Sequence, residues 1–440
     1  MAEVILADLV HPHCSRYTHC LEERVNKLLS SLGNGTSEHV YLILQQHAGC
    51  SEEAPANLRS VVAKRAELER RVHVLTDSSS VAVLYAFKRA ADELSVTHVH
   101  VMTCSARRAE LQECEKQLFT ELYTFTYSTV LDCSGCPLTE NNPTCPQDTH
   151  LTQITEQISG FLQRIPALRG EISVLKSPLI SDCFAHGFTT RTGGISYIRT
   201  LSSLNLFSSS RRRDPRAVVA ENLRRLGLHA GFHPYNFHLS KVNHSNDVWV
   251  MNKPEPESYD AIVTNQPGVV IAAPGADCMP LLFADPVGKV IGAAHAGWRG
   301  TLMGVAMATV NAMVREFGSE PANVVAVIGP SVGPCCFTLE QNSARKFQAI
   351  HPDCVKDVES PKTYVDIRLA TRVLLENGGL LPEHIQDNTV TNRPNIPNIT
   401  LCTSCNPDSF FSHVRDGTNF GTQIGFLWIK ESHEFTQSDS

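Results

Sequence analysis

The amino-acid sequence predicts an α/β protein of two domains, and three observations support this prediction. The chain has 440 residues, of which 42% are hydrophobic, and this length exceeds what a single core usually serves. Along residues 1–131, short β-branched runs alternate with amphipathic segments of helical length. Residues 132–150 then carry three prolines and three cysteines, a composition typical of a loop or linker.

The first domain, residues 1–131, should form a small α/β layer with a mainly parallel sheet. The expected strands cover residues 3–10, 39–47, 71–76 and 97–103, and the expected helices cover residues 56–71, 80–94 and 107–122. No Gly-rich phosphate loop follows any of these strands. We therefore expect this domain to be regulatory, binding a protein partner or a second copy of the chain, rather than to hold an active site.

Residues 132–169 are expected to form the linker and a connecting helix. Apolar residues recur at helical spacing up to Pro166, at Leu151, Ile154, Ile158, Phe161, Leu162 and Ile165. The second domain should then run over residues 170–430, beginning with a strand over 171–180, and residues 431–440 should be a flexible tail.

Composition narrows the classes of function. The net charge is −7 and no basic run is longer than Arg211–Arg213, which argues against a nucleic-acid surface. We expect this short run to lie in a solvated loop. The first ten residues lack the basic leader of a signal peptide, and no apolar run reaches the roughly 18–20 residues of a membrane helix. We expect a soluble, cytoplasmic protein.

In such a compartment, the fifteen cysteines are interpreted as free thiols and ligands rather than as a disulfide framework. Cys133 with Cys136, and Cys402 with Cys405, form two CxxC pairs. Together they could make a four-thiolate zinc site, but the simpler interpretation is unconnected thiols. Cys335 and Cys336 are expected to be packed thiols.

Three residues of the second domain are candidate metal ligands. His244 lies in a Val-Asn-His-Ser-Asn turn, Cys278 directly precedes an apolar run, and His295 ends another. One thiolate and two imidazoles would fill three positions of a tetrahedral zinc ion and leave the fourth for water or substrate. Their wide spacing means that the fold must gather them from different strands, which favours a catalytic site over a local zinc finger.

Candidate anion contacts accompany these ligands. Arg191 lies in a Thr-Arg-Thr-Gly-Gly segment and could bind phosphate or a carboxylate, although a surface arginine in a turn is the alternative. Arg299 should lie just ahead of a helix running to about residue 317, where free N–H groups favour an anion. Asn222, in a further expected helix, is either a surface residue or an inward-facing anchor.

Five motifs in this order resemble the laccase-domain purine nucleoside phosphorylases: HGFTTRTGG, GADCMP, HAGWRG, GPSVGPCC and FFSHVRDG. The resemblance implies a two-sheet α/β sandwich flanked by helices rather than a cupredoxin barrel. It implies metal ligands at His244, Cys278 and His295, with catalysis at the same residues. The family's Gln-Val-His-Gly element appears here as Lys-Val-Asn-His-Ser, with the histidine displaced by one residue. Substrate or phosphate contacts are implied for Arg191, Arg299 and Arg415.

The same resemblance implies the activity. It is phosphorolysis of adenosine, inosine, guanosine and methylthioadenosine, together with adenosine deamination, with zinc, or alternatively copper, as the metal and phosphate as co-substrate. The implied setting is purine nucleoside metabolism, macrophage immunometabolism and innate immunity, with association to the nucleus, peroxisome or endoplasmic reticulum as well as the cytoplasm.

Three other classes of function stay open. A copper-dependent phenol oxidase would need many histidines in HxH and HCH patterns, but the HxH pairs here are His11 with His13 and His98 with His100, in the first domain. A hydrolase could use Cys278 as a nucleophile activated by an imidazole. A non-catalytic adaptor would work through the first domain.

Overall fold

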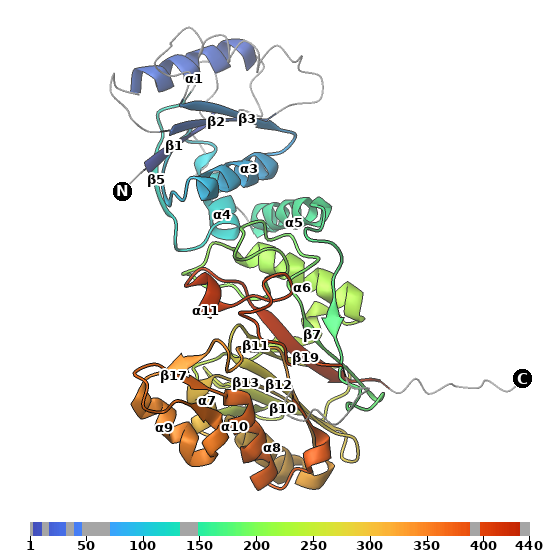
Figure 1. Ribbon diagram of the computed structural model, residues 1–440. Helices are drawn as coiled ribbons and strands as arrows, with labels where there is room; N and C mark the ends of the chain where they lie inside the picture. Colours follow the sequence, from blue (N-terminus) through green and yellow to red (C-terminus); the bar gives the residue numbers. More distant parts are fainter. Residues whose placement is uncertain are drawn as a thin grey trace, which may run out of the picture. The chain divides into compact units, whose positions relative to one another are not determined.

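The computed structural model describes residues 3–10, 17–31, 39–45, 71–132, 148–387 and 397–431 (Figure 1). The chain forms two compact units, one of residues 1–166 with 208–218 and one of residues 167–207 with 219–440. The predicted domain limits stay a prediction, because compactness alone does not show which segment folds by itself. The cysteines of the linker, the pair His11 and His13, most of the expected helix over 56–71 and the C-terminal tail beyond residue 431 lie outside the described residues.

The first unit contains a five-stranded parallel sheet, which confirms the predicted α/β layer. Its strand order is β3-β2-β1-β4-β5. The strands are β1 (Glu3–Asp8), β2 (His39–Gln45), β3 (Val72–Asp77), β4 (His98–Met102) and β5 (Thr124–Ser128). The helices are α1 (Tyr17–Ser31), α3 (Ser80–Glu93), α4 (Arg108–Leu118) and α5 (Asp148–Arg164). The hydroxyl of Ser79 caps α3 by accepting from the amide of Ala82, so this helix begins where the polar turn ends.

Arg212 and Arg213 are not part of a solvated loop, so that prediction was wrong for both. Arg212 is buried, and its carbonyl accepts a hydrogen bond from Thr120. Arg213 donates to Asp92, its Nη1 lying 2.6 Å from the carboxylate Oδ1. The sequence suggested a solvated run because Asp92, the buried carboxylate that pairs with Arg213, lies more than a hundred residues away.

The second unit is a sandwich of two sheets flanked by helices, as the resemblance implies. One sheet has the order β18-β14-β12-β13-β10-β9 and the other β6-β7-β19-β11-β8, while β15, β17 and β16 form a small third sheet. The strands of the first sheet are β9 (Val248–Val250), β10 (Ala261–Thr264), β12 (Met279–Asp285), β13 (Val290–Ala296), β14 (Val325–Ile328) and β18 (Ile385–Gln386). Those of the second are β6 (Val174–Leu175), β7 (Phe184–Thr189), β8 (Phe237–Leu239), β11 (Val270–Gly275) and β19 (Gln423–Ile429); the small sheet holds β15 (Thr338–Leu339), β16 (Val355–Lys356) and β17 (Thr363–Val365).

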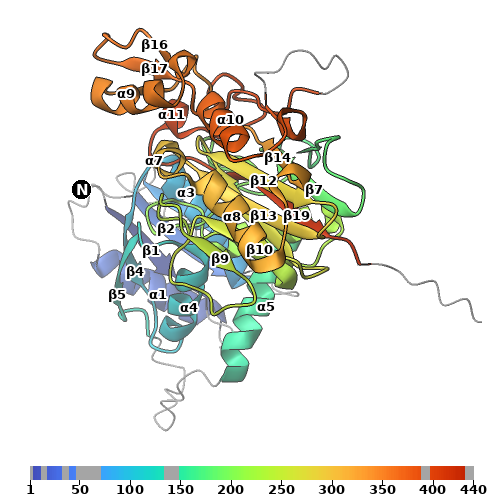
Figure 2. The same cartoon turned by 90° about the horizontal axis from the view of Figure 1, so that it is seen from below.

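The second unit also contains helices, several of which flank the sandwich. They are α6 (Arg216–Ala230), α7 (Trp298–Leu302), α8 (Val305–Phe317), α9 (Gln341–Ile350), α10 (Ile367–Asn377) and α11 (His413–Asp416). Four short 3-10 helices each begin with proline: Pro234–Asn236, Pro321–Asn323, Pro352–Cys354 and Pro382–His384. Figure 2 shows α8 lying along the sheet of β12, β13 and β10, and apolar residues of α8 and α10 join that sheet in one core. A second core fills the space between the two sheets.

The expected helix after His295 is interrupted, so the prediction of one continuous helix was wrong. The chain turns at Met303 and Gly304 between α7 and α8, and Gly304 has a φ of 79°, a conformation that glycine adopts readily. Arg299 therefore lies in the first turn of α7 rather than ahead of a long helix. The expected strand over 171–180 is reduced to the two residues of β6.

Asn222 is an inward-facing anchor, which decides between the two alternatives. Its side chain is fully buried, accepts from the amide of Ile195 at 2.9 Å, and donates to Ser196 and to the carbonyl of Asn205. The Gly193-Gly194 pair serves the same internal packing, because a Cβ on Gly194 would lie 2.1 Å from the carbonyl oxygen of Ser203.

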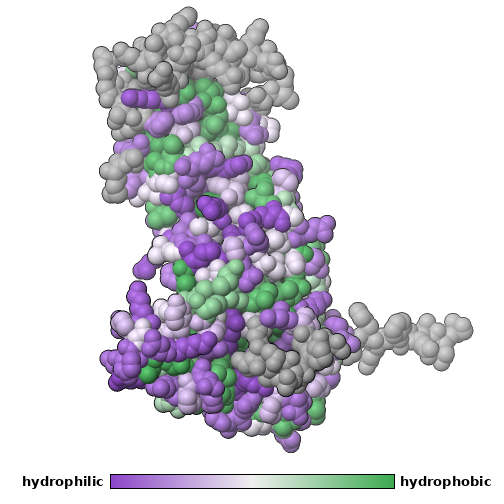
Figure 3. All heavy atoms as spheres, viewed as in Figure 1, coloured by the Kyte–Doolittle hydropathy of each residue, from purple (hydrophilic) through white to green (hydrophobic). Residues whose placement is uncertain are grey.

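The surface is of mixed polarity. Hydrophilic residues are interspersed with hydrophobic ones across the face shown in Figure 3. Large exposed apolar side chains such as Leu228, Tyr235 and Val287 occur on separate loops and helices, which is ordinary for a protein surface. Within the described ranges, none of the helices combines the length and apolar character that crossing a membrane requires.

Candidate metal centre

The strand pairing of β12, β13 and β10 brings the predicted ligands together. In the β12–β13 hairpin, Pro280 pairs with His295, so Cys278, just ahead of β12, lies beside the end of β13. The loop that carries His244 precedes β9, the parallel neighbour of β10 in the same sheet. One ligand atom from each of His244, Cys278 and His295 lies within 4.8 Å of the others. The displaced histidine of the Lys-Val-Asn-His-Ser element therefore does reach the cluster.

Asp260, directly before β10, holds two of the three ligands in place. Its Oδ1 lies 2.8 Å from Nδ1 of His295 and accepts from the backbone amide of His244 at 3.1 Å. Its Oδ2 accepts from the amides of Asn243 and Ser245. A carboxylate only accepts, so Nδ1 of His295 carries the hydrogen and Nε2 is left for a metal, the usual second partner of a metal-binding histidine.

The turn at His244 is held by this carboxylate. His244 has a φ of 64°, in the left-handed region that few residues other than glycine and asparagine adopt. The three successive amides of residues 243–245 all point at the buried side chain of Asp260, which compensates the strained conformation. The Asp260 carboxylate thereby places the His244 imidazole and orients the His295 imidazole at the same time.

The electrostatics of the cluster favour the ligating form of the thiol. Burial raises the pKa of Cys278, but the neighbouring His295 and His244 outweigh burial and lower it to about 6. Burial conversely lowers the pKa of His295, while the Cys278 thiolate and Asp260 raise it to about 9. A thiolate that forms near neutral pH is the state that binds a metal or attacks a substrate.

One side of the cluster is closed and the other is open. His295 is buried, Cys278 is half-buried and His244 is exposed. Gly297 closes the floor, because a Cβ there would lie 2.9 Å from Sγ of Cys278 and 3.5 Å from the ring of His244. Only glycine allows the backbone to approach the thiol this closely, and the exposed His244 lies on the open side.

Arg299 lies close to the cluster in sequence and is exposed. It is two residues beyond Gly297, and its guanidinium lies 5.0 Å from the ring centroid of Trp298. Of the three predicted anion contacts, Arg299 is exposed, whereas Arg191 is buried and Arg415 is half-buried.

Arg191 and Arg415 are bound to backbone carbonyls. Arg191 donates to Ser202, Pro407 and Arg199, and its guanidinium lies 4.8 Å from the ring centroid of Phe411. Arg415 donates to the carbonyls of Thr403, Ser404 and Phe410 and to the carboxylate of Asp416. Both arginines stabilise loops in this structure, and their role as substrate contacts stays a prediction.

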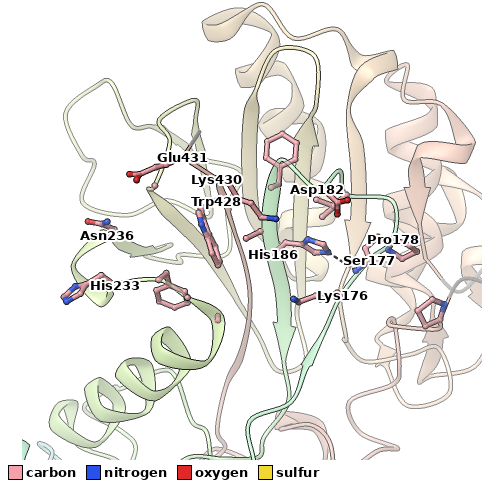
Figure 4. Close-up of a pocket in the computed structure, with 18 residues that line it drawn as sticks. Lys176, Ser177, Pro178, Asp182, His186, His233, Asn236, Trp428, Lys430 and Glu431 are labelled. Carbon is pink, nitrogen blue, oxygen red and sulfur yellow. Dashed lines mark hydrogen bonds between the residues drawn. The ribbon is translucent and has the colours of Figure 1, made fainter. Parts of the chain in front are cut away.

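A pocket of about 1060 Å³ lies elsewhere on the second unit and contains none of the three ligands (Figure 4). Lys176, Lys430 and Trp428 are among its lining residues, and Nε2 of His186 accepts from the amide of Ser177. Burial, reinforced by the positive charge of Lys176, lowers the pKa of His186 to about 4, so this imidazole is neutral.

Comparison with known proteins identifies the family. The family model described as "Multi-copper polyphenol oxidoreductase laccase" matches residues 185–430, more than half of the chain. The human protein named "Purine nucleoside phosphorylase LACC1" is 45% identical over 98% of this chain and 100% of its own length. The chain belongs to the laccase-domain purine nucleoside phosphorylase family.

Bacterial members of this family match the second unit. A protein of Deinococcus radiodurans named "Purine nucleoside phosphorylase" is 38% identical over 48% of this chain and 80% of its own length. The crystal structure of YlmD from Geobacillus stearothermophilus is 27% identical, covers 58% of this chain and 94% of that chain, and superposes with a TM-score of 0.51. The sandwich is therefore the part that this chain shares with the shorter laccase-domain proteins.

Two parts of the site were missing from the predictions. In the sequence, Asp260 directly precedes the apolar run Ala261–Val263, and in the structure it is buried. A buried carboxylate needs hydrogen-bond donors, so its position was a signal of such partners. Gly297 is the third residue of the HAGWRG motif. The need for glycine there follows from the nearby Sγ of Cys278, which the sequence alone does not place.

Proposed function

We propose that this chain is a zinc-dependent purine nucleoside phosphorylase. The coarser assignment, an enzyme of the purine nucleoside phosphorylase kind, rests on the named relatives. The proposed substrates are adenosine, inosine, guanosine and methylthioadenosine, with adenosine deamination as a second activity. One observation supports the metal above all: a thiol and two imidazoles converge within 4.8 Å, with one imidazole oriented by Asp260 and one side open.

The donor set suits zinc. A soft thiolate and two imidazoles match its preferred ligands, and three protein ligands with an open fourth position are the pattern of catalytic zinc sites. A bound zinc ion would supply Lewis-acid polarisation to whatever occupies that position. The chain would supply the rest: Asp260 keeps the hydrogen of His295 on Nδ1, and Gly297 keeps the floor of the site free for the thiolate.

Phosphorolysis breaks the bond between the ribose and the base, forms a bond from a phosphate oxygen to the ribose, and leaves the base protonated. The phosphate must therefore be held next to the sugar. We assign this contact to Arg299, which is exposed in the first turn of α7, two residues after Gly297. Arg191 and Arg415 would have to exchange carbonyl partners before they could bind phosphate.

A copper-dependent phenol oxidase is the second candidate, because the description of the matching family model names that chemistry. Multi-copper oxidation needs further histidine-rich sites near the first. His98 and His100 lie on β4 of the first unit, and both ring nitrogens of His100 lie within hydrogen-bond distance of Thr126 and Ser128. The second unit offers two groups of cysteine and histidine among its described residues, and one of them contains no histidine.

Product analysis tests the proposal. The full chain is incubated with inosine or adenosine, with and without phosphate, and the products and bound metal are identified. Phosphate-dependent release of base and ribose 1-phosphate is expected, and adenosine should also yield inosine without phosphate. Copper-dependent oxidation of phenols in the absence of both products would show that the oxidase assignment is the right one. Hydrolysis that survives metal removal but not Cys278→Ser would indicate a cysteine hydrolase instead.

A further inference from the structure

A second cluster of sulfur atoms lies in the same unit as the candidate centre. The Sγ atoms of Cys335, Cys336, Cys402 and Cys405 all lie within 4.8 Å of one another. The Sγ atom of Cys405 lies 3.3 Å from Sγ of Cys336 and 3.6 Å from Sγ of Cys335. The CxxC pair at 402 and 405 therefore meets the Cys-Cys pair at 335 and 336, so these four cysteines are neither unconnected nor merely packed in the core.

We propose that these four cysteines bind one structural zinc ion, separate from the ion proposed at His244, Cys278 and His295. Zinc–sulfur bonds of about 2.3 Å place tetrahedral sulfurs about 3.8 Å apart, close to the separations seen. Core packing does not explain the group, because Cys335 and Cys405 are exposed. One disulfide would use two of the sulfurs at about 2.05 Å and would leave the gathering of the other two unexplained.

The backbone around the cluster is already arranged for thiolates. The amide of Gly333 donates to Sγ of Cys402 at 3.3 Å. Ser331 and Cys402 form a β-bridge, in which the amide of Thr403 donates to the carbonyl of Ser331 at 3.0 Å. The two loops that carry the cysteines are thus held side by side before any metal joins them. Gly333 is confined as well, since a Cβ there would lie 3.3 Å from Sγ of Cys335.

A buried cation lies beside the sulfurs and suits their charge. Four thiolates and one zinc ion carry a net charge of −2, which is costly in a partly buried place unless a positive group is near. Arg368 is buried, donates to the carbonyl of Thr400 at 2.9 Å, and also donates to the carbonyls of Ser331 and Leu401. Its Nη1 lies 3.6 Å from where a Cβ of Gly333 would stand, so the guanidinium adjoins the cluster.

The proposed ion would have a structural role, since four protein ligands leave no open position. It would tie together two loops that also support the candidate active site. Thr403, next to Cys402, donates through its hydroxyl to Asp277 at 2.5 Å, and the amide of Val332 donates to the carbonyl of Asp277. Asp277 directly precedes Cys278. Binding requires only that the thiols lose their protons to solvent, with no oxidation or reduction.

Metal counting on the full chain, purified without chelators and kept reduced with a phosphine, tests the proposal. We expect two zinc ions per chain in the wild type and one in the Cys335→Ser/Cys405→Ser variant. Cys183→Ser is the matched control, because Cys183 is a free, half-buried cysteine outside both clusters, and it should keep two. A double-serine variant that retains as much zinc as the wild type would overturn the proposal.

Cys278→Ser separates this proposal from the catalytic one and does not depend on the double variant folding. It should keep one zinc ion, held by the four cysteines, even if the catalytic assignment fails. Loaded with cobalt instead, this chain should show the strong thiolate-to-cobalt absorption of a tetrahedral sulfur site. The proposal would be wrong if that absorption were absent. It would also be wrong if freshly isolated, unreduced protein were two hydrogens lighter and the difference mapped to a disulfide between Cys336 and Cys405.

Discussion

Replacing Asp260 with asparagine should weaken metal binding at the candidate centre without removing a ligand. The carboxylate accepts from His295 Nδ1 and from three backbone amides. An asparagine has one acceptor oxygen. Its amino group must face either His295 and the amide of His244 or the amides of Asn243 and Ser245, so two of these four hydrogen bonds are lost. Loss of such an outer partner typically lowers metal affinity about 10- to 100-fold, which corresponds to about 1.4–2.7 kcal/mol.

Zinc affinity is measured by competition with a chromophoric chelator, and thermal unfolding is followed in parallel. Asp247→Asn is the matched control: Asp247 is exposed and accepts from Ser245 and Asn243 in the same loop, but contacts no ligand. The control should stay within about twofold of the wild type. If Asp260→Asn binds zinc as tightly as the control while remaining folded, Asp260 does not position the ligands and the reasoning is wrong.

Gly297→Ala should lower zinc affinity about tenfold or more, because the new methyl group would lie 2.9 Å from Sγ of Cys278. Gly160→Ala is the control, because its added carbon would meet no atom nearer than 3.9 Å. Equal zinc affinities of the two variants would contradict the prediction. His186→Gln should remove a pH dependence of stability. His186 has a pKa of about 4 in the folded chain and about 6.5 when unfolded, so the unfolded state binds more protons between these values and the wild type loses up to roughly 3 kcal/mol as the pH falls through that window. Unfolding midpoints that fall equally with pH in both proteins would contradict this.

The sequence predicted the layers well because their signals are local. Alternating β-branched runs and amphipathic segments predicted the parallel sheet of the first unit, and the repeat ending at Pro166 predicted α5. The break between α7 and α8 was not predicted, because the apolar residues keep helical spacing across Met303 and Gly304. Only the left-handed backbone at Gly304 interrupts the helix. Periodicity reports which face is apolar and does not report whether the backbone is continuous.

The candidate site was predicted in part for a related reason. Cys278 and His295 stand in adjacent motifs, and the β12–β13 hairpin makes them neighbours. Asp260 and the partners of Cys402 depend on which distant segments meet, and no local pattern carries that information. Cys402 and Cys405 lie against Cys335 and Cys336, so interpreting them as unconnected thiols was wrong, whereas Cys133 and Cys136 lie outside the described residues.

The Ala-Asp-Cys segment explains why motifs far apart in the chain belong together. Cys278 faces the two imidazoles, while the buried Asp277 turns the other way, accepting from the hydroxyl of Thr403 and from the amide of Val414 at 2.7 Å. Arg415 then holds the same loop through the carbonyl of Thr403. The Cys-Thr and Arg-Asp-Gly elements are thus parts of one hydrogen-bonded support for the residue before the thiol. Changes at Arg415 would therefore act on the site through the position of Cys278, whether or not its guanidinium ever meets a substrate.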